Sequence, residues 1–340
     1  MTDPLEKARQ IADDVLFPAA LEVDATGVIP AAHLDLLAGA GFYGMAAGQV
    51  ADPPRIVEWL AGGCLATTFV WMQHHGAVRA VADSGRPDLV EQWLGPLCRG
   101  ERRAGVALGA LRPGPPSVRA TPVDGGYRLD GISPWVTGWG MTDVLHTAAR
   151  EAPRTGDARV TPRTGGAGPA VETAIWALVD AVPGATLSVR PLDLVAVNAS
   201  ATVEVTFDGH FVPAERVTAT LPYARWGARD AAGLRMNGSF ALGVAGRAIR
   251  LLGERALALP AELDACRATL DAAAPDDLPA ARAAASELAM RAATTLTVAE
   301  GARSVLRGHH AQRLVREAMF LLVFGSRPLV KSALLTLVSR

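Results

Sequence analysis

Residues 129–137 of this 340-residue chain read Leu-Asp-Gly-Ile-Ser-Pro-Trp-Val-Thr and belong to a region with the pattern of β-strands. From about Gly105 to Leu221, short runs of β-branched or alternating residues are bounded by Gly, Pro or Asp, as is typical of strands. These runs are YRLDGI (127–132), DVLHTAA (143–149), TAIWALVD (173–180), TLSVRPL (186–192) and ATVEVTF (201–207). The pattern predicts a β-domain over residues 105–222. Within it, the Gly-, Pro- and Arg-rich segment 151–170 is predicted to be an exposed loop.

Helical patterns lie on both sides of this β-region, over residues 1–104 and 223–340. Asp3 before Pro4 predicts a helix start, and that first helix is expected to stop before Pro18. Near the C-terminus, Leu288, Ala292, Leu296 and Ala299 follow helical spacing. Strands and helices are therefore segregated along the chain, which indicates an α+β multidomain fold and argues against a Rossmann-type sheet.

The glycine pair in Gly243-Val244-Ala245-Gly246 is not a dinucleotide-binding loop. It lies inside a helical pattern, and no strand precedes it. We expect these glycines to permit close packing between helices instead.

Composition excludes several classes of protein. The chain has 33 Lys+Arg and 34 Asp+Glu, and half of its residues are hydrophobic, so it is neither disordered nor an electrostatic nucleic-acid binder. Only Lys7 and Lys331 are lysines, a bias that fits a GC-rich genome. Any contact with a phosphate must therefore come almost wholly from arginine.

Cysteine usage and the termini indicate a soluble cytoplasmic protein. Cys64, Cys98 and Cys266 are far apart and form neither a CxxC pair nor a zinc pattern, so no metal site is expected. The N-terminus has no basic segment followed by a long apolar one, which argues against a signal peptide. The apolar run from Ala318 to Gly325 is too short to cross a membrane.

Several motifs, taken in order, resemble those of the acyl-CoA dehydrogenase superfamily. Glu22–Pro30 resembles its "E-x-D-x-x-G-x-x-P", and residues 129–137 resemble "L-N-G-x-K-x-W-I-T". The other matching stretches are Gly41-Phe42-Tyr43-Gly44, the segment CLATTFVWMQHHG (64–76), Asp143, and residues 198–217, which end in Phe207-Asp208-Gly209-His210-Phe211-Val212-Pro213.

The resemblance implies an N-terminal α-helical domain, a middle β-barrel-like domain and a C-terminal four-helix bundle. It also implies FAD bound between the β-domain and the bundle, an acyl-CoA substrate, and assembly as a dimer or a dimer of dimers. Segment 64–76 would correspond to the helix over the acyl site. On this basis the chain is expected to be a flavin-dependent oxidoreductase of CH–CH groups. Its charge balance and its short apolar runs, described above, argue against nucleic-acid and membrane partners.

The resemblance also assigns candidate cofactor residues. Trp135 would pack near the isoalloxazine ring, and Val136 and Thr137 would offer hydrogen bonds to its polar edge; the alternative is that Trp135 belongs to the β-domain core. Ser117 is the residue that could replace the serine of the family's "T-E-P-x-x-G-S-D", whose Thr and Glu are missing here. Arg316, in Arg316-Glu317-Ala318, matches "R-D-A" and would lie near the cofactor or form a surface or interface ion pair. Residues 255–270 lack the family's "R-x-x-F-G".

The catalytic glutamate of the family is not found. Its first position reads Val323-Phe324-Gly325-Ser326, with Gly325 where the carboxylate is expected, and its second reads Gly233-Leu234-Arg235. Asp230 is nearby but is typical of a helix cap. His310 is a weak candidate base, because His310-Ala311-Gln312-Arg313 resembles the "H-P-x-Q-R" of flavin monooxygenases with this fold; the alternative is that His309 and His310 are polar residues ending the long helix. His74 and His75 could likewise face a substrate or serve the structure.

Three functions remain open at this stage. The simplest is an acyl-CoA dehydrogenase-like flavoprotein that forms homo- or hetero-oligomers. The missing motifs favour a cofactor-poor subunit of a heteromeric acyl-CoA dehydrogenase, in which FAD is weakly bound, shared or absent. The histidine motif favours a flavin-dependent monooxygenase.

Overall fold

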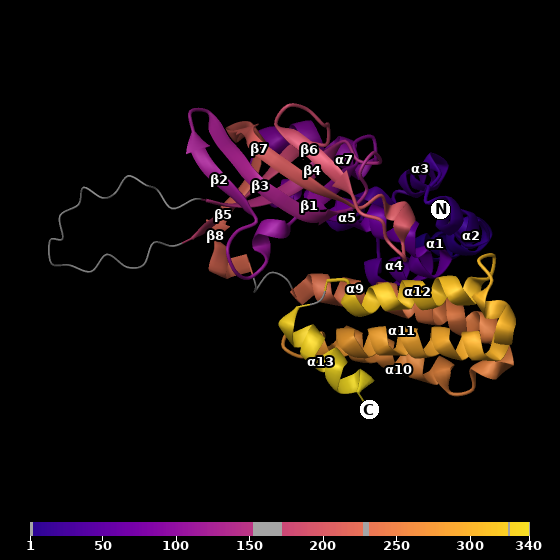
Figure 1. Ribbon diagram of the computed structural model, residues 1–340. Helices are drawn as coiled ribbons and strands as arrows, with labels where there is room; N and C mark the ends of the chain where they lie inside the picture. The colour runs from indigo at the N-terminus through magenta and orange to yellow at the C-terminus, as the bar shows by residue number, and fades with distance from the viewer. Residues whose placement is uncertain (1–2, 152–171, 227–230, 326, 340) are drawn as a thin grey trace, which may run out of the picture. The chain divides into compact units, whose positions relative to one another are not determined.

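The computed structural model describes residues 3–151, 172–226, 231–325 and 327–339 (Figure 1). Asp230 and almost all of the predicted loop 151–170 lie outside these residues. The order of helices, then strands, then helices is confirmed. Two compact units are formed, one from Met1–Met72, Asp193–Ala201 and Arg229–Arg340, the other from Gln73–Leu192 and Thr202–Ala228. The division into domains at residues 104 and 222 stays a prediction.

The first unit begins with a continuous helical stretch that passes Pro18. It consists of α1 (Pro4–Gln10), a π-helix η1 (Ile11–Leu16) and α2 (Phe17–Thr26). The expectation that the first helix stops before Pro18 is therefore wrong. Pro18 falls in the first turn of α2, where a missing N–H costs little, and a change to π-helical hydrogen bonding precedes it.

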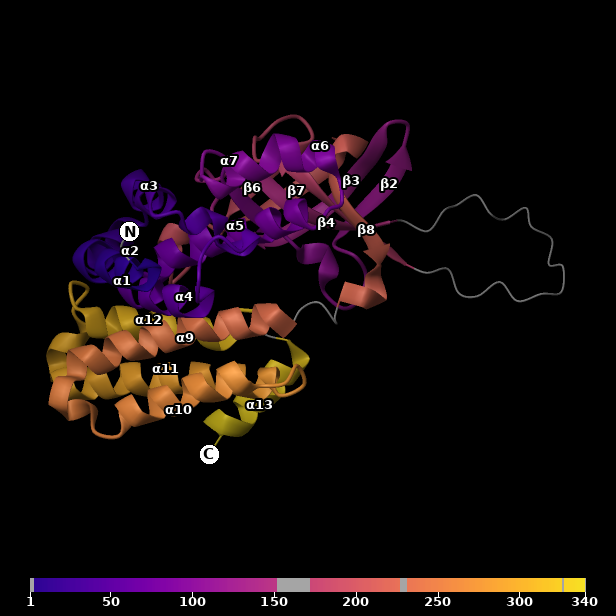
Figure 2. The same cartoon turned by 180° about the vertical axis from the view of Figure 1, so that it is seen from behind.

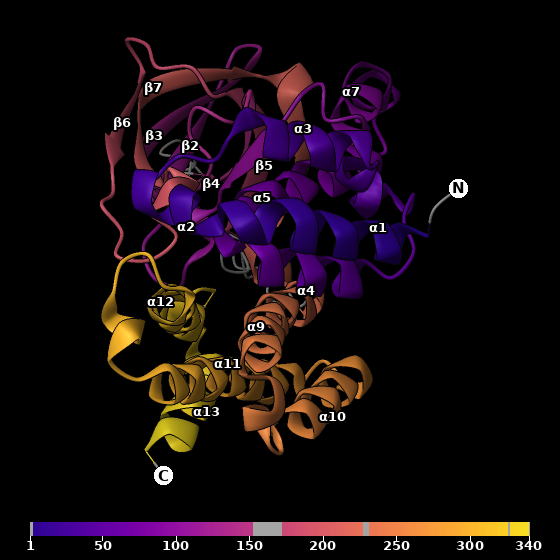
Figure 3. The same ribbon diagram turned by 90° about the vertical axis from the view of Figure 1, so that its right-hand side faces the viewer.

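Further helices complete the N-terminal part of this unit and form its C-terminal part. The first group is α3 (Ala31–Gly39), η2 (Phe42–Ala47), α4 (Pro53–Gly63) and the start of α5 (Leu65–Ala82), with η5 (Asn198–Ser200) from later in the chain. The second is α9 (Ala231–Leu252), η8 (Gly253–Ala256), α10 (Leu259–Ala272), α11 (Leu278–Glu300), η9 (Gly301–Val305), α12 (His310–Val323) and α13 (Pro328–Val338). Helices α9, α10, α11 and α12 lie side by side (Figures 1 and 2), and Figure 3 views them nearly along their axes.

Two glycines allow α4 and α9 to touch through their backbones. A side-chain carbon added at Gly243 would lie 2.3 Å from the carbonyl oxygen of Glu58, and one added at Gly62 would lie 2.8 Å from the carbonyl oxygen of Gly243. Arg247, one turn further along α9, donates a hydrogen bond of 2.6 Å to the carbonyl oxygen of Gly62. The expectation that the glycines at 243 and 246 serve close helix packing is confirmed for Gly243, whereas an added side-chain carbon at Gly246 would make only ordinary contacts.

The second unit is built around one sheet of the described strands, in the order β6-β7-β3-β2-β4-β5-β8, with β1 paired to β4. The strands are β1 (Ala104–Ala107), β2 (Val118–Val123), β3 (Gly126–Val136), β4 (Val144–Glu151), β5 (Thr173–Asp180), β6 (Leu187–Pro191), β7 (Val203–Pro213) and β8 (Val217–Pro222). Short helical segments precede, join and follow the strands: α6 (Pro87–Leu89), η3 (Val90–Leu94) and α7 (Gly95–Cys98) come before β1, η4 (Gly109–Leu111) and η6 (Ala214–Arg216) lie between strands, and η7 (Tyr223–Arg225) follows β8. Apolar side chains including Val118, Leu145, Val205 and Phe207 form the core of the unit.

Candidate functional site

Trp135 lies one residue before the end of β3 and turns away from the sheet core. Its side chain is 53% exposed, although its neighbour Val136 is fully buried. The backbone at Trp135 has φ +61°, and the pairing of β3 with β7 is irregular between Ser133 and Val136. A left-handed backbone is costly for a bulky residue, and such strain is concentrated at functional sites. The β-domain core alternative for Trp135 is excluded, because the core would bury this ring.

The two residues after Trp135 are held inside the unit. Val136 packs in the sheet core and pairs with Val203 of β7. Thr137 is 3% exposed, and its hydroxyl lies 3.2 Å from the hydroxyl of Thr202, so one of the two donates to the other. This hydrogen bond holds the backbone that follows Trp135 in place. The two hydroxyls carry two hydrogens, and only one of these is used between them.

Ser117 lies against the same end of β3 and has an unused hydroxyl. Its Oγ is buried and has no hydrogen-bond partner among the described residues, whereas its carbonyl accepts a 2.8 Å hydrogen bond from the N–H of Ile132. Gly109 lies beside both Ser117 and Pro134 and, having no side chain, leaves room for them. A side-chain carbon there would lie 2.7 Å from Cδ of Pro134 and 2.9 Å from Oγ of Ser117. Ser117 and Trp135, predicted separately, are thus brought to one region of the second unit.

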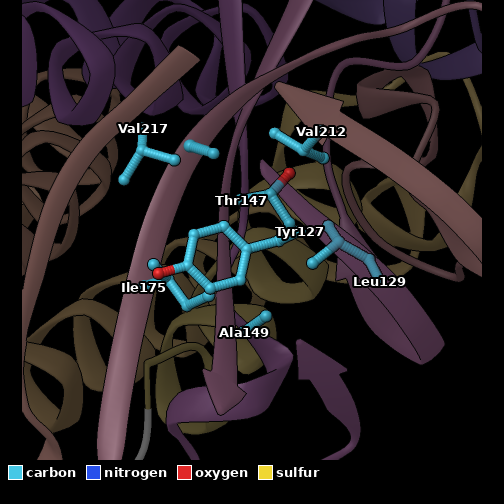
Figure 4. Close-up of a pocket in the computed structure, with 8 residues that line it drawn as sticks. Tyr127, Leu129, Thr147, Ala149, Ile175, Val212 and Val217 are labelled. Carbon is cyan, nitrogen blue, oxygen red and sulfur yellow. The ribbon is translucent and has the colours of Figure 1, made fainter. Parts of the chain in front are cut away.

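A small hollow within the sheet is too small to be a binding site for a substrate or cofactor. It is lined by Tyr127, Leu129, Thr147, Ala149, Ile175, Ala177, Val212 and Val217, which come from five strands (Figure 4). The hollow has room for about one water molecule, and most of its lining is apolar. A substrate or cofactor does not fit there, so it is a packing defect of the core.

Arg316 of α12 is fully engaged within the first unit. Its Nε donates to Oε1 of Gln312 at 2.9 Å, and its Nη1 donates to Oδ1 of Asp24 and to the carbonyl of Val195 at 2.8 and 2.9 Å. Its Nη2 donates to Oδ2 of Asp24 and to Oε1 of Gln312. A guanidinium has five N–H donors, and all five are used. The expectation that Arg316 contacts the cofactor stays a prediction, but in this structure it links α12 to α2 and to the segment at Val195.

His310 is packed and hydrogen-bonded near the start of α12. Its ring stacks on Phe17 at a centroid distance of 4.2 Å, and its Nδ1 accepts from Arg313 at 3.3 Å. Burial, together with the charges of Arg313 and Arg247, lowers the pKa of His310 to about 4. The ring is neutral at pH 7, but its Nδ1 is not free to take up a proton.

His309 and His310 do not end the long helix, as one alternative proposed. That helix, α11, stops at Glu300, and Gly301 with φ +63° terminates it. His309 instead caps the start of α12, where its side chain accepts a 3.2 Å hydrogen bond from the N–H of Ala311. These histidines therefore define a helix start.

His74 is a structural bridge in the second unit. Its Nδ1 accepts from the N–H of Ala104 at 3.0 Å, and its Nε2 therefore donates to the carbonyl of Leu97 at 3.1 Å. Burial, followed by the charge of Arg103, lowers the pKa of His74 to about 3, and burial also lowers the pKa of His75 well below its usual value. Both ring nitrogens of His74 are therefore used in hydrogen bonds that join α5 to Leu97 of α7 and to Ala104 of β1.

The buried histidines predict that stability is lost in mild acid. Burial lowers the pKa of His146 to about 4, whereas an unfolded histidine titrates near 6.5. The unfolded chain therefore binds more protons, so the stability due to His146 is complete above about pH 6.5 and declines as the pH falls towards 4. The shift corresponds to about 3 kcal/mol for this fully buried ring.

Urea unfolding at pH 7.5 and pH 5 would measure this effect. We expect the denaturation midpoint of the wild type to fall steeply between the two values. The variant His146→Gln keeps a partner for Thr218, whose hydroxyl lies 3.1 Å from Nε2 of His146, but cannot titrate. Its midpoint should fall less; an equal fall in both proteins would contradict the assignment.

The two positions expected for a catalytic glutamate carry no carboxylate in the described chain. Gly325 follows α12 with φ +58°, and its neighbour in space is the amide of Asn237. At the second position, Leu234 is buried and Arg235 donates to Asp271 at 3.0 Å. Asn237 was not identified from the sequence, because no motif marks it and its relation to Gly325 arises only in the fold.

Among the described residues, no group of three or more His, Cys, Asp or Glu side chains is placed to hold a metal ion. No helix in the described part of the chain is both long and apolar enough to cross a membrane.

Comparison with known proteins identifies the relatives of this chain. Residues 3–101 match the family model described as acyl-CoA dehydrogenase, N-terminal domain. Benzylmalonyl-CoA dehydrogenase of Aromatoleum aromaticum is 28% identical over 219 residues, which cover 60% of this chain and 53% of that protein. 3-Sulfinopropanoyl-CoA desulfinase of Variovorax paradoxus is 30% identical over 161 residues, 42% of this chain and 39% of that protein. The matched part thus spans about half or less of these curated relatives.

Solved structures resemble the whole chain. Butyryl-CoA dehydrogenase of Megasphaera elsdenii superimposes with a TM-score of 0.80 at 18% identity, over 100% of this chain and 99% of that one. The FAD complex of PigA gives a TM-score of 0.76 at 17% identity, over 99% and 96% of the two chains. With its N-terminal helices, central β-sheet and C-terminal helices, the chain has the acyl-CoA dehydrogenase fold and belongs, as a distant relative of these proteins, to the acyl-CoA dehydrogenase superfamily.

Proposed function

We propose that the chain is a flavin-dependent oxidoreductase that acts on a CH–CH bond of an acyl-CoA. Exposed Trp135, held in a left-handed backbone at the end of β3, is the observation that carries the proposal. A large aromatic ring turned to solvent at an energetic cost suits a site for a flat ligand. The names of the relatives, which are CoA-ester enzymes, and the FAD in the PigA complex support the same proposal.

The residues around Trp135 fit a flavin in part. Trp135 would cover one face of the ring, and the unused hydroxyl of Ser117 would donate to a phosphate or carbonyl oxygen. The hydrogen bond between Thr137 and Thr202 would hold in place the backbone that follows Trp135. A bound flavin would supply the acceptor for the hydride; the side chains of this unit would orient it and keep water from one face. The chain is also proposed to work as a homo- or hetero-oligomer.

Two observations favour a second candidate, a cofactor-poor subunit of a heteromeric acyl-CoA dehydrogenase. All five N–H donors of Arg316 are already bound within the chain. Gly325 offers no carboxylate, and removal of the α-proton of an acyl thioester needs a base. The third candidate, a monooxygenase that uses His310, has less support because Arg313 occupies Nδ1 of that ring.

Replacing Trp135 should weaken flavin binding. We expect Trp135→Ala to raise the dissociation constant for FAD by about tenfold or more, because an aromatic contact contributes about 0.5–1.5 kcal/mol beyond the area it buries. Quenching of flavin fluorescence during titration of the purified chain measures this constant. Phe211→Ala is the matched control, since Phe211 is a similarly exposed aromatic residue on β7 of the same sheet.

Two outcomes would count against the proposal. Equal losses in Trp135→Ala and Phe211→Ala would remove the special role of Trp135. A colourless protein that takes up no FAD, alone or together with co-expressed partner chains, would reject flavin chemistry. Full FAD occupancy in a homo-oligomer of this chain would instead reject the cofactor-poor subunit.

A further inference from the structure

Residues 108–117, which join β1 to β2 and are called the connecting segment below, are held through their carbonyl groups. The phenol oxygen of Tyr223 lies 3.2 Å from the carbonyl oxygens of residues 111 and 112, and its one hydrogen is shared between them. Nη2 of Arg150 donates a hydrogen bond to the carbonyl of Gly114. Two side chains from other parts of the second unit therefore bind the middle of the connecting segment.

Arg150 and Tyr223 are themselves fixed to each other and to Glu172. The guanidinium of Arg150 lies over the ring of Tyr223, 4.4 Å from its centroid, and Arg150 is only 2% exposed. Nη1 of Arg150 donates to a carboxylate oxygen of Glu172 at 3.1 Å. The carbonyl of Glu172 accepts a 2.8 Å hydrogen bond from the N–H of Tyr223. Because these three residues restrain one another, the two groups that donate to the connecting segment have fixed positions.

Arg150 is a costly residue for a purely structural contact. Its Nε is buried and has no hydrogen-bond partner among the described residues. Its counter-charge is partly solvated, since the side chain of Glu172 is 43% exposed. A buried guanidinium with an unsatisfied N–H loses hydration that its partners do not fully replace. An apolar side chain of similar length would cover the Tyr223 ring without this cost, so the cation indicates a role other than stability.

The hydrogen-bond donors of the connecting segment are unused. Three of the residues from 113 to 117 are prolines, so only Gly114 and Ser117 carry a backbone N–H there. Neither N–H has an acceptor in the described part of the chain, and the same holds for the buried hydroxyl of Ser117. The carbonyl of Ser117, by contrast, accepts from the N–H of Ile132 at 2.8 Å. Carbonyls of this segment are thus bound within the unit, while donors remain available to a ligand.

We propose that Arg150 and Tyr223 are positioning residues, which hold the connecting segment in the form that presents Ser117 to the flavin. The inference rests on the proposed function for its ligand and adds two residues that act through the segment. Arg150 fixes Gly114, and Tyr223 fixes the turn before it. The donors of Ser117 are then oriented before the ligand arrives, and binding avoids the entropy loss of ordering a loop.

Arg150→Met separates this role from a structural one. Methionine keeps an unbranched chain over Tyr223 but removes the donor to Gly114. We expect the melting temperature of the flavin-free chain to stay the same or rise, because a buried cation disappears and the exposed Glu172 stays solvated. The dissociation constant for FAD should nevertheless rise about tenfold, and in Tyr223→Phe, which keeps the ring, about threefold to fivefold. Flavin-fluorescence titration and calorimetry of the same preparations measure both quantities.

Arg216→Met is the matched control in the same unit. The guanidinium of Arg216 also lies over an aromatic ring, that of Trp93 at 4.7 Å, and also pairs with a carboxylate, that of Asp180 at 3.1 Å. In the described structure it donates no hydrogen bond to the connecting segment. We therefore expect FAD affinity to be unchanged in Arg216→Met.

A double variant and hydrogen exchange test whether Arg150 acts through the segment. Ser117→Ala should weaken FAD binding in the wild type but have less effect when added to Arg150→Met. Without flavin, peptides covering residues 108–117 should exchange faster in Arg150→Met and Tyr223→Phe, and at the wild-type rate in Arg216→Met.

The same measurements contain the results that would overturn the inference. These are FAD uptake by the wild type with unchanged affinity in Arg150→Met and Tyr223→Phe, a marked fall in the melting temperature of Arg150→Met, or full additivity with Ser117→Ala. Each would leave the proposed oxidoreductase in place. No FAD uptake by the wild type, alone or with co-expressed partner chains, would instead reject the proposed function and remove the ligand on which this inference depends.

Discussion

Gly243→Ala should destabilise the protein by about 3 kcal/mol or more, an effect at the upper end of those seen for overpacking. The new methyl carbon would lie 2.3 Å from the carbonyl oxygen of Glu58, 2.8 Å from Cβ of Ala61 and 2.9 Å from the backbone nitrogen of Gly62. Two of these atoms belong to the backbone of α4, which cannot move aside as a flexible side chain does. The variant must therefore separate α4 from α9, and with them the contact between Arg247 and Gly62.

Gly246→Ala provides a matched control on the same helix. A side-chain carbon at Gly246 meets Cδ2 of Leu263 at 3.5 Å, an ordinary contact distance. Alanine favours a helix interior over glycine by about 1 kcal/mol, so this variant should be as stable as the wild type or slightly more stable. Urea unfolding followed by circular dichroism measures both. Equal stability of the two variants would show that α4 and α9 are not in backbone contact.

The sequence predicted the arrangement of secondary structure well because its signals are local. Strand patterns end at Pro222, and helical patterns resume afterwards, as the structure confirms. The glycines at 243 and 246 were correctly excluded as a dinucleotide loop because no strand precedes them, although only the fold distinguishes Gly243, which touches α4, from Gly246, which does not. A pattern places a residue on a helix; it does not identify the neighbouring helix.

The errors came from backbone features that a composition pattern does not encode. Pro18 is a sound signal for a helix end, but a π-helical segment over Ile11–Leu16 lets the helical stretch continue. The alternative in which His309 ends the long helix is wrong, because Gly301 ends α11 eight residues earlier and His309 caps the start of α12. In both cases the residue type correctly indicates a helix end or cap, but the sequence does not show which helix that residue belongs to.

The candidate site was predictable only where a motif marks it. Trp135 was found through the motif around it, but its left-handed backbone and its exposed ring are properties of the folded strand. Asn237 lies 88 residues before Gly325 in the sequence, and the fold brings the two together, with Phe240 of α9 packed against Phe324 beside Gly325. The sequence shows that a glutamate is missing at position 325, but it does not show that Asn237 lies beside that position.

The buried ion pair between Arg313 and Glu317 should give the other large effect. Nη1 of Arg313 donates to Oε1 of Glu317 at 2.5 Å, and the two side chains are 1% and 5% exposed. The second carboxylate oxygen of Glu317 has no hydrogen-bond partner among the described residues, and burial raises the pKa of this carboxyl. Glu317→Leu leaves the guanidinium of Arg313 buried without its counter-charge, so we expect a loss of about 3–5 kcal/mol.

Removing both charges should restore most of that stability. Arg313→Met/Glu317→Leu replaces the pair by apolar side chains of similar volume, and such replacements are often close to neutral because two desolvation costs disappear with the attraction.

Glu287→Leu is the matched control, because it breaks an exposed ion pair of the same helical spacing. Glu287 and Arg291 also lie four residues apart on a helix, joined at 3.0 Å, but their side chains are 29% and 43% exposed, and breaking such a pair costs about 0.3–0.5 kcal/mol. Guanidinium unfolding of these three variants and the wild type separates the buried pair from the exposed one. If Glu317→Leu costs no more stability than Glu287→Leu, the pair is solvated and not buried. If the double variant is as unstable as Glu317→Leu, the loss comes from altered packing around the pair and not from an unpaired charge.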